Sequence, residues 1–248
     1  MFFRKKHAAK TVSVTVCFAA LYAVFGFLPI SKIIGLNGYI TAATIMAPII
    51  GVLLGPYIGA VSVVLGGVIG FFVATISTPS LVSGVIATLC AGMLCNGKRS
   101  LCAFVYFSML FLFGFYPFVG PIWLYLPLVW FQIAVFLILI SPIQSMATRR
   151  LNSNSDSKIL SAFFVTSLTS TLAGQIAGSL TFEVISWPIF MADVNTWRSY
   201  WHVLTFVYPI ERTIIALCAA LIGISLHKAL QSANLTVLSR ESPQETSS

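Results

Sequence analysis

The chain has 248 residues, of which 58% are hydrophobic and only 8% are charged. Soluble domains carry about 25% charged residues, so this composition excludes a water-soluble globular protein and predicts a chain that folds in a lipid bilayer. The net charge of +8 would indicate nucleic-acid binding in a soluble protein, but the basic residues form short clusters between apolar runs, so we expect no nucleic-acid partner.

The apolar runs are continuous and do not alternate with polar residues, which predicts transmembrane helices and excludes a β-barrel. The eight candidate spans are 11–30, 39–54, 57–76, 80–95, 101–118, 121–147, 159–185 and 203–228. Residues 1–228 are therefore expected to form one helical bundle of an all-α polytopic membrane protein. We expect six to eight transmembrane helices, because one adjacent pair of segments could form a hairpin that does not span.

The basic clusters predict the orientation of the chain in the membrane. If the N-terminus is cytoplasmic, eight crossings also place Lys98, the 148–158 loop and Lys228 inside, and leave only Lys32 and Arg198 outside. This distribution follows the positive-inside rule and predicts cytoplasmic termini in a cell-membrane protein. The polar stretch 229–248 has no apolar period, so we expect a disordered cytoplasmic tail there.

Pairs of small residues four positions apart let two helices approach closely. The pairs in this chain are Ala19 with Ala23, Gly55 with Gly59, Gly66 with Gly70, and Gly174 with Gly178. For any single pair, the simplest interpretation is helix packing within the chain. Ala19 and Ala23, in the first span, raise a second possibility, which is a flat face that receives a helix of another protein.

The order of features over residues 8–98 resembles the substrate-binding (S) component of energy-coupling factor transporters, the vitamin-uptake family. A basic start precedes an alanine-rich span, followed by the loop "SKIIGLNGY", the turn "GPYIGA" (55–60) and a short small-residue span that ends in "NGKRS" (96–100). Ala19 and Ala23 match the alanine-x-x-x-alanine motif of the family's first helix. Family members usually have six helices, so 101–147 looks like an additional apolar hairpin.

The resemblance implies a receptor that captures a small vitamin-like solute from outside the cell under a first loop, here 31–38. It also implies that Ala19 and Ala23 dock on a transmembrane coupling subunit, which works with two ATPase subunits. The sequence itself contains no GxxxxGK[ST] phosphate-binding motif, so the chain is not expected to hydrolyse ATP or to be an enzyme.

Residues that a membrane disfavours gather in 182–212, where ionisable groups alternate with tryptophans. Aromatic walls with a few polar groups suit a flat heterocyclic ligand, and an arginine suits a carboxylate or phosphate. From Lys158 to Glu183 the helix would rise by about 37 Å, which places Glu183 at the outer interface. The candidate ligand-binding residues are Asn37, Gln175, Glu183, Trp187, Asp193, Trp197, Arg198, Trp201, His202, Glu211 and Arg212.

Each of these residues also has a structural interpretation. The tryptophans would form an aromatic belt at the membrane surface. Glu211 follows Pro209, so it could begin a helix and complement the helix dipole. Arg212 could pair with Glu183 or Asp193, and Gln175 could bond to a neighbouring helix instead of a ligand.

Three other functions remain open from the sequence. An ion-coupled secondary transporter is disfavoured because no charge is expected in the core of the bundle. An intramembrane enzyme would use His202 with Asp193 or Glu211 as acid and base, and a structural membrane subunit would need no site at all. We expect no catalytic residue, cofactor or metal ion, and we take the small-molecule receptor as the main hypothesis.

Overall fold

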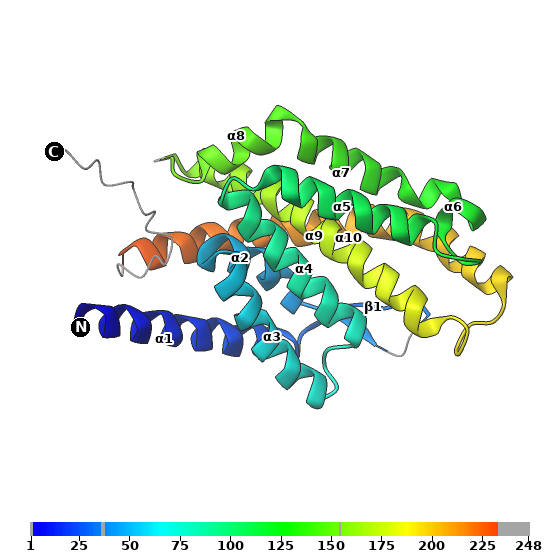
Figure 1. The fold of residues 1–248 in the computed structure, drawn as a ribbon, viewed down its shortest axis with the longest axis horizontal. Helices are drawn as coiled ribbons and strands as arrows, with labels where there is room; N and C mark the ends of the chain where they lie inside the picture. Colours follow the sequence, from blue (N-terminus) through cyan, green and yellow to red (C-terminus); the bar gives the residue numbers. More distant parts are fainter. Residues whose placement is uncertain (1, 36–37, 154, 233–248) are drawn as a thin grey trace.

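The structure is a computed structural model that describes residues 2–35, 38–153 and 155–232. In chain order, the elements are α1 (Phe2–Phe25), β1 (Pro29–Lys32), β2 (Tyr39–Thr41), α2 (Ala43–Leu54), α3 (Pro56–Phe72), α4 (Thr78–Cys95), α5 (Arg99–Gly114), α6 (Pro121–Leu124), the 3-10 helix η1 (Leu126–Val129), α7 (Trp130–Ile140), α8 (Pro142–Arg150), α9 (Asp156–Ser186) and α10 (Val194–Ser232). The helices run back and forth along the long axis, and the start of α1 and the end of α10 lie at the same end (Figure 1).

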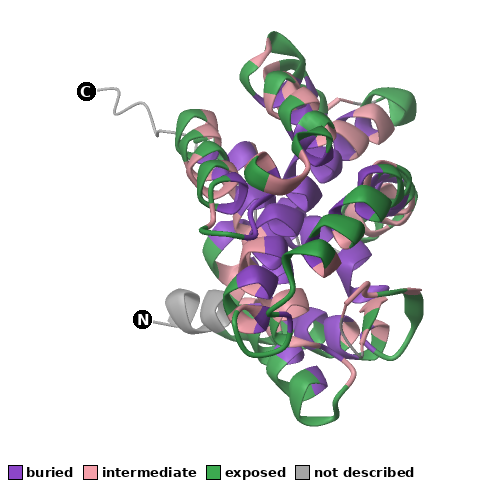
Figure 2. Cartoon of the chain, turned by 90° about the vertical axis from the view of Figure 1, so that its right-hand side faces the viewer, coloured by how far each residue is buried: buried purple, intermediate pink, exposed green. Residues whose placement is uncertain are grey.

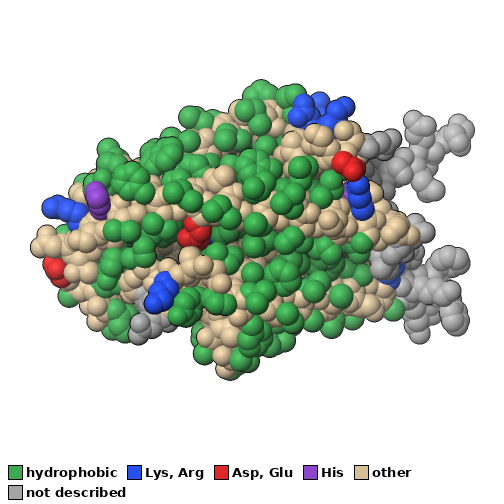
Figure 3. All heavy atoms as spheres, turned by 180° about the vertical axis from the view of Figure 1, so that it is seen from behind, with side chains coloured by type: hydrophobic (Ala, Val, Ile, Leu, Met, Phe, Trp, Pro, Cys, Tyr) green, Lys and Arg blue, Asp and Glu red, His purple; other side chains and the backbone are tan. Residues whose placement is uncertain are grey.

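Within the described residues, α4, α9 and α10 are long and apolar enough to cross a membrane. A fourth span is possible if Leu126–Ile140 and Pro142–Arg150, which meet at an angle of 66°, form one broken helix. The surface in Figure 3 is largely hydrophobic, with most basic side chains towards its two ends. These findings confirm the prediction of an all-α membrane protein, while the finer prediction of six to eight spans and cytoplasmic termini stays a prediction.

Each of the eight apolar segments contains helix, but several boundaries differ from the prediction. Segment 121–147 is interrupted at Ser141, whose hydroxyl accepts a hydrogen bond from the N–H of Ile143 at the start of α8. Helix α10 begins at Val194 and not near residue 203, and it continues to Ser232. Residues 229–232 are therefore helical and not part of a tail, and 233–248 lie outside the described residues.

A short antiparallel hairpin, which the sequence did not predict, joins α1 to α2. Strand β1 pairs with β2 through Pro29 opposite Thr41 and Lys32 opposite Tyr39. Gly35, with a φ of 90°, lies in the connection between the strands, where only glycine adopts this conformation without strain. Of the predicted 31–38 loop, Ser31 and Lys32 belong to β1 and Ile33–Gly35 and Gly38 lie between the strands, while Asn37 lies outside the described residues.

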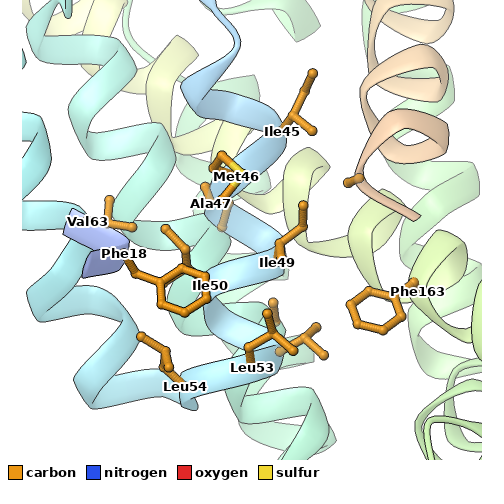
Figure 4. Close-up of a cluster of buried hydrophobic side chains, with 14 of the residues drawn as sticks. Phe18, Ile45, Met46, Ala47, Ile49, Ile50, Leu53, Leu54, Val63 and Phe163 are labelled. Carbon is orange, nitrogen blue, oxygen red and sulfur yellow. The ribbon is translucent and has the colours of Figure 1, made fainter. Parts of the chain in front are cut away.

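Helix α2 is the centre of the hydrophobic core, since all twelve of its residues are buried. Figure 4 shows its side chains between Phe18 of α1, Val63 of α3 and Phe163 of α9. A helix that is hydrophobic on every side is stable when it is covered on every side. Of the predicted span 39–54, residues 39–41 form β2 and residues 43–54 form this interior helix. Buried residues concentrate in the middle of the molecule (Figure 2).

Helix α1 packs against α3 through the alanine pair of the first span. Ala19 and Ala23 are only 5% and 7% exposed. A Cβ atom added to Gly66 of α3 would lie 2.3 Å from the carbonyl oxygen of Ala19 and 3.2 Å from the amide nitrogen of Ala23. The helix that these alanines admit is therefore α3 of the same chain, so their face is not an open docking surface in this structure.

The other glycines singled out in the sequence also lie at close approaches. Gly55, with a φ of 79°, forms the junction between α2 and α3. A Cβ atom added to the remaining glycines would contact a residue of another segment. The contacts are Gly59 with Thr88, Gly70 with Ile76, Gly174 with Ser83, and Gly178 with Pro79 and Ser83. The last two contacts let α9 approach α4, which forms one wall of the site described next.

Candidate ligand-binding site

A cavity lies between the hairpin connection and the facing sides of α4, α9 and α10. Its volume of about 60 Å³ is several times the roughly 10–15 Å³ that one water molecule needs. The residues that line it are Ile33, Ile34, Ile40, Thr44, Pro79, Ser80, Ser83, Gln175, Gly178, Ser179, Phe182, Leu204, Tyr208 and Arg212. Ile33, Ile34 and Ile40 of the loop and hairpin thus form one side of a cavity whose other lining residues are both polar and apolar.

A chain of side-chain hydrogen bonds forms the polar wall of the cavity. Gln132 of α7 donates from Nε2 to Oε1 of Gln175 at 3.2 Å, and Gln175 donates from Nε2 to Oγ of Ser179 at 3.0 Å. Ser179 in turn lies 3.5 Å from the hydroxyl of Tyr208. The chain fixes the orientation of the Gln175 amide, and it leaves Oε1 of Gln132 buried with no partner among the described residues.

Arg212 supplies a positive charge to the same cavity. Its side chain is buried, and Nη2 lies 3.2 Å from Oε1 of Glu211, the residue before it in α10. The other carboxylate oxygen of Glu211 accepts a hydrogen bond from Ser31 of β1 at 3.4 Å, which connects the hairpin to α10. The Nε–H of Arg212 has no acceptor in the described part of the chain. A buried donor without a partner is costly, so Arg212 is available to a ligand acceptor.

The predicted site therefore assembles only in part. Gln175 and Arg212 line the cavity, and Glu211 forms an ion pair with Arg212. Glu211 lies inside the continuous helix α10, so the prediction that it begins a helix is wrong. Arg212 pairs with Glu211 and not, in the described residues, with Glu183 or Asp193.

Two of the predicted tryptophans belong to the core behind the cavity. Trp197 and Trp201 are fully buried, and their indole N–H groups donate to the carbonyl oxygens of Met191 and Val119, both at 2.7 Å. Their rings pack on Phe182, with centroids at 5.3 and 6.5 Å. They form neither an aromatic belt nor the wall of the cavity, but they support Phe182, which does line it.

Three of the remaining candidates are exposed near the start of α10. Asp193 accepts hydrogen bonds from the N–H of Asn195 at 3.0 Å and the hydroxyl of Thr196 at 2.9 Å. These two bonds lower the pKa of Asp193 below its ordinary value, because they stabilise the ionised carboxylate. Arg198 and His202 point to the surface, and the ring of His202 contacts Tyr125 at 5.2 Å.

Trp187 and Glu183 lie at the end of α9, outside the cavity lining. Trp187 is half-buried and packs against Phe118 at 6.1 Å. Glu183 is 0% exposed, which contradicts the expectation that the core carries no charged residue. Neither of its carboxylate oxygens finds a hydrogen-bond partner among the described residues.

Several lining residues were missed from the sequence. Tyr208 lay in the aromatic stretch but was not selected, and Ser179 follows Gln175 by four positions, so it lies on the same helix face. Ser80, Ser83 and Thr44 come from α4 and from the start of α2, and no local pattern connects them to α9 or α10. In the described ranges, no three His, Cys, Asp or Glu side chains come together as a metal site requires.

No family model, no curated protein and no solved structure matches the chain. The function therefore has to be argued from the cavity and its residues.

Proposed function

We propose that the chain is the membrane-embedded substrate-binding subunit of an energy-coupling factor uptake transporter. The observation that carries the proposal is a cavity bordered by Ile33 and Ile34 of the first loop and lined by a buried arginine, Arg212, with an unused donor. A loop over a chamber between helices is the arrangement that the resemblance in residues 8–98 implies for capture of an external solute.

The solute that suits this cavity has an apolar, preferably aromatic, body and an anionic group. Phe182, Leu204 and the three isoleucines offer apolar contact, Arg212 offers a donor to a carboxylate or phosphate, and the Gln175 chain offers directional hydrogen bonds. Typical ligand pockets have volumes of about 300–1,000 Å³, well above the volume of this one. The hairpin must therefore move away from α9 and α10 to admit a vitamin-sized molecule.

Energy for transport would come from partners, since the sequence has no nucleotide-binding motif. The partners are a transmembrane coupling subunit and two ATPase subunits. Because α3 covers Ala19 and Ala23, the coupling subunit would meet the adjacent side of α1, where Val16, Ala20 and Val24 are exposed at four-residue spacing. Such a row of short side chains permits close helix contact.

Two measurements test this proposal. Native mass spectrometry of the purified protein should detect a co-purified anionic small molecule. Its occupancy should fall more than about tenfold in Arg212→Ala, because each 1.4 kcal/mol of lost interaction is a factor of ten. The matched control is Arg198→Ala, which removes an exposed arginine of the same helix. Accumulation of solute by liposomes that contain this chain alone would refute the receptor proposal.

A further inference from the structure

A row of polar side chains winds around α9 through the interior of the bundle. Ser167, Thr171, Gln175, Ser179 and Glu183 succeed one another at intervals of four residues. None of them is more than 6% exposed. Sixteen residues of helix rise by about 24 Å, which is most of the about 30 Å thickness of a hydrocarbon core. A polar row of this length in the interior of a membrane protein indicates a function, because buried polar groups there are costly.

The row ends at Glu183, where unpartnered oxygen atoms accumulate. Thr171 donates to the backbone carbonyl oxygen of Ser167 at 2.7 Å, and Gln175 donates to Ser179 at 3.0 Å. Oγ of Ser167 is a single buried oxygen without a partner at the start of the row. At its end, Oε1 and Oε2 of Glu183 and Oγ of Ser186, one turn further along, are all buried without a partner among the described residues. Three unpartnered oxygen atoms thus lie on the last turn of α9, on residues that are both 0% exposed.

No positive charge of the described chain neutralises this carboxylate. The charged or titratable side chains on the part of α10 that packs along this end of α9 are Arg198, Tyr200, His202, Tyr208, Glu211 and Arg212. Helices α2, α4, α5, α7 and α8 also pack on α9, and their charged or titratable side chains are Cys90, Cys95, Arg99, Cys102, Tyr106, Arg149 and Arg150. Arg99 bonds to Ser141 and Ser145, and Arg149 and Arg150 are exposed at the end of α8. Arg198 and His202 are exposed, and Arg212 forms its ion pair with Glu211. An isolated buried carboxylate is far too costly to persist. A positive charge from outside the chain must therefore accompany Glu183.

We propose that Glu183 and Ser186 form a buried binding site for one monovalent cation, either a proton on the carboxyl group or a sodium ion among the three oxygen atoms. A single carboxylate balances a single positive charge, and oxygen donors suit a hard cation. Glu183 lies one helical turn beyond Ser179, which lines the cavity, while Glu183 and Ser186 themselves lie outside the lining. This inference does not depend on the proposed receptor function.

The test compares thermal unfolding of the wild type and Glu183→Gln in detergent, with Asp193→Asn as the control at an exposed carboxylate. One arm varies pH between about 5 and 9 without sodium, and the other replaces choline by sodium at constant ionic strength and about pH 8. If the ligand is a proton, the wild type loses several degrees relative to Glu183→Gln as pH rises, since the unfolded carboxyl releases a proton that the native one retains. If the ligand is sodium, sodium raises the melting temperature of the wild type by several degrees and leaves Glu183→Gln unchanged.

A labelling experiment on the wild type keeps the test valid if Glu183→Gln does not fold. Dicyclohexylcarbodiimide, an apolar reagent, reacts with a protonated carboxyl group. The acid proton moves to a carbodiimide nitrogen, the carboxylate oxygen bonds to the central carbon, and the adduct rearranges to a stable N-acylurea. Peptide mass spectrometry should find the label on Glu183, with protection at high pH or by sodium. Identical responses of wild type and Glu183→Gln in both arms would overturn the proposal, as would labelling of Glu183 that neither pH nor sodium changes.

Discussion

Replacing Gly66 by alanine tests the contact between α1 and α3. The new Cβ atom would lie 2.3 Å from the carbonyl oxygen of Ala19 and 3.1 Å from its carbonyl carbon, where ordinary contacts begin at 3.4 Å. The shortfall against the oxygen is 3.4 − 2.3 = 1.1 Å. Because the obstructing atoms belong to the backbone, no side-chain rotation relieves the clash, and α1 must move away from α3 as a unit.

Overpacking of this kind costs about 1–3 kcal/mol. For a chain of this size, each kcal/mol lowers the melting temperature by about 2–4 °C, so we expect Gly66→Ala to unfold about 2–12 °C earlier. The assay is tryptophan fluorescence of the detergent-purified protein during heating, since the chain contains five tryptophans.

The adjacent variant Gly67→Ala is the matched control. Its Cβ would also come within 2.3 Å of an atom, but that atom is Cδ1 at the tip of the Leu81 side chain, which can rotate away. We expect a clearly smaller loss of stability. Equal melting temperatures for Gly66→Ala and the wild type, or equal losses for the two variants, would show that Ala19 and Ala23 do not pack on α3 and would restore the possibility of an open docking face.

Two further predictions concern hydrogen bonds of the site and its surroundings. Gln132→Leu leaves Oε1 of Gln175 without its donor, so we expect a loss of about 0.5–2 kcal/mol in the free energy of unfolding. If the two side chains pair, the Gln132→Leu, Gln175→Leu double variant loses less stability than the sum of the two single variants. A loss equal to that sum would contradict the pairing. Asp193→Ala should lower the melting temperature at neutral pH, and Asp193→Asn should lower it by less, because asparagine keeps an acceptor oxygen for α10 but not the charge. Since hydrogen bonds lower the pKa of Asp193, the contribution of its charge is complete above the ordinary carboxyl pKa of about 3.9 and disappears as pH falls through the lower native value. The difference between wild type and Asp193→Ala should therefore become smaller in strong acid, and a constant difference down to about pH 2 would refute the assignment.

Much of the architecture follows from the sequence, because a bilayer permits few alternatives. The low proportion of charged residues and the continuous apolar runs require helices, since each backbone polar group must be satisfied within its own segment. Glycine and proline at 55–56 separate α2 from α3 as their backbone preferences demand. Gln175 and Arg212 could be identified as candidates because polar groups are rare at such positions, and both line the cavity.

The tertiary structure decided which neighbour covers each helix face. The spacing of Ala19 and Ala23 indicates that a helix can approach, but only the folded chain shows that the helix is α3. Likewise, only the folded chain shows that Trp197 and Trp201 are buried in the core and that the side chain of Glu183 is inaccessible to solvent. In a soluble protein, a polar side of each helix would have marked the outward direction. In this chain almost every side of the helices is apolar, so a side that faces lipid and a side that faces the protein interior have the same sequence pattern. Only the packing of the folded chain distinguishes the two.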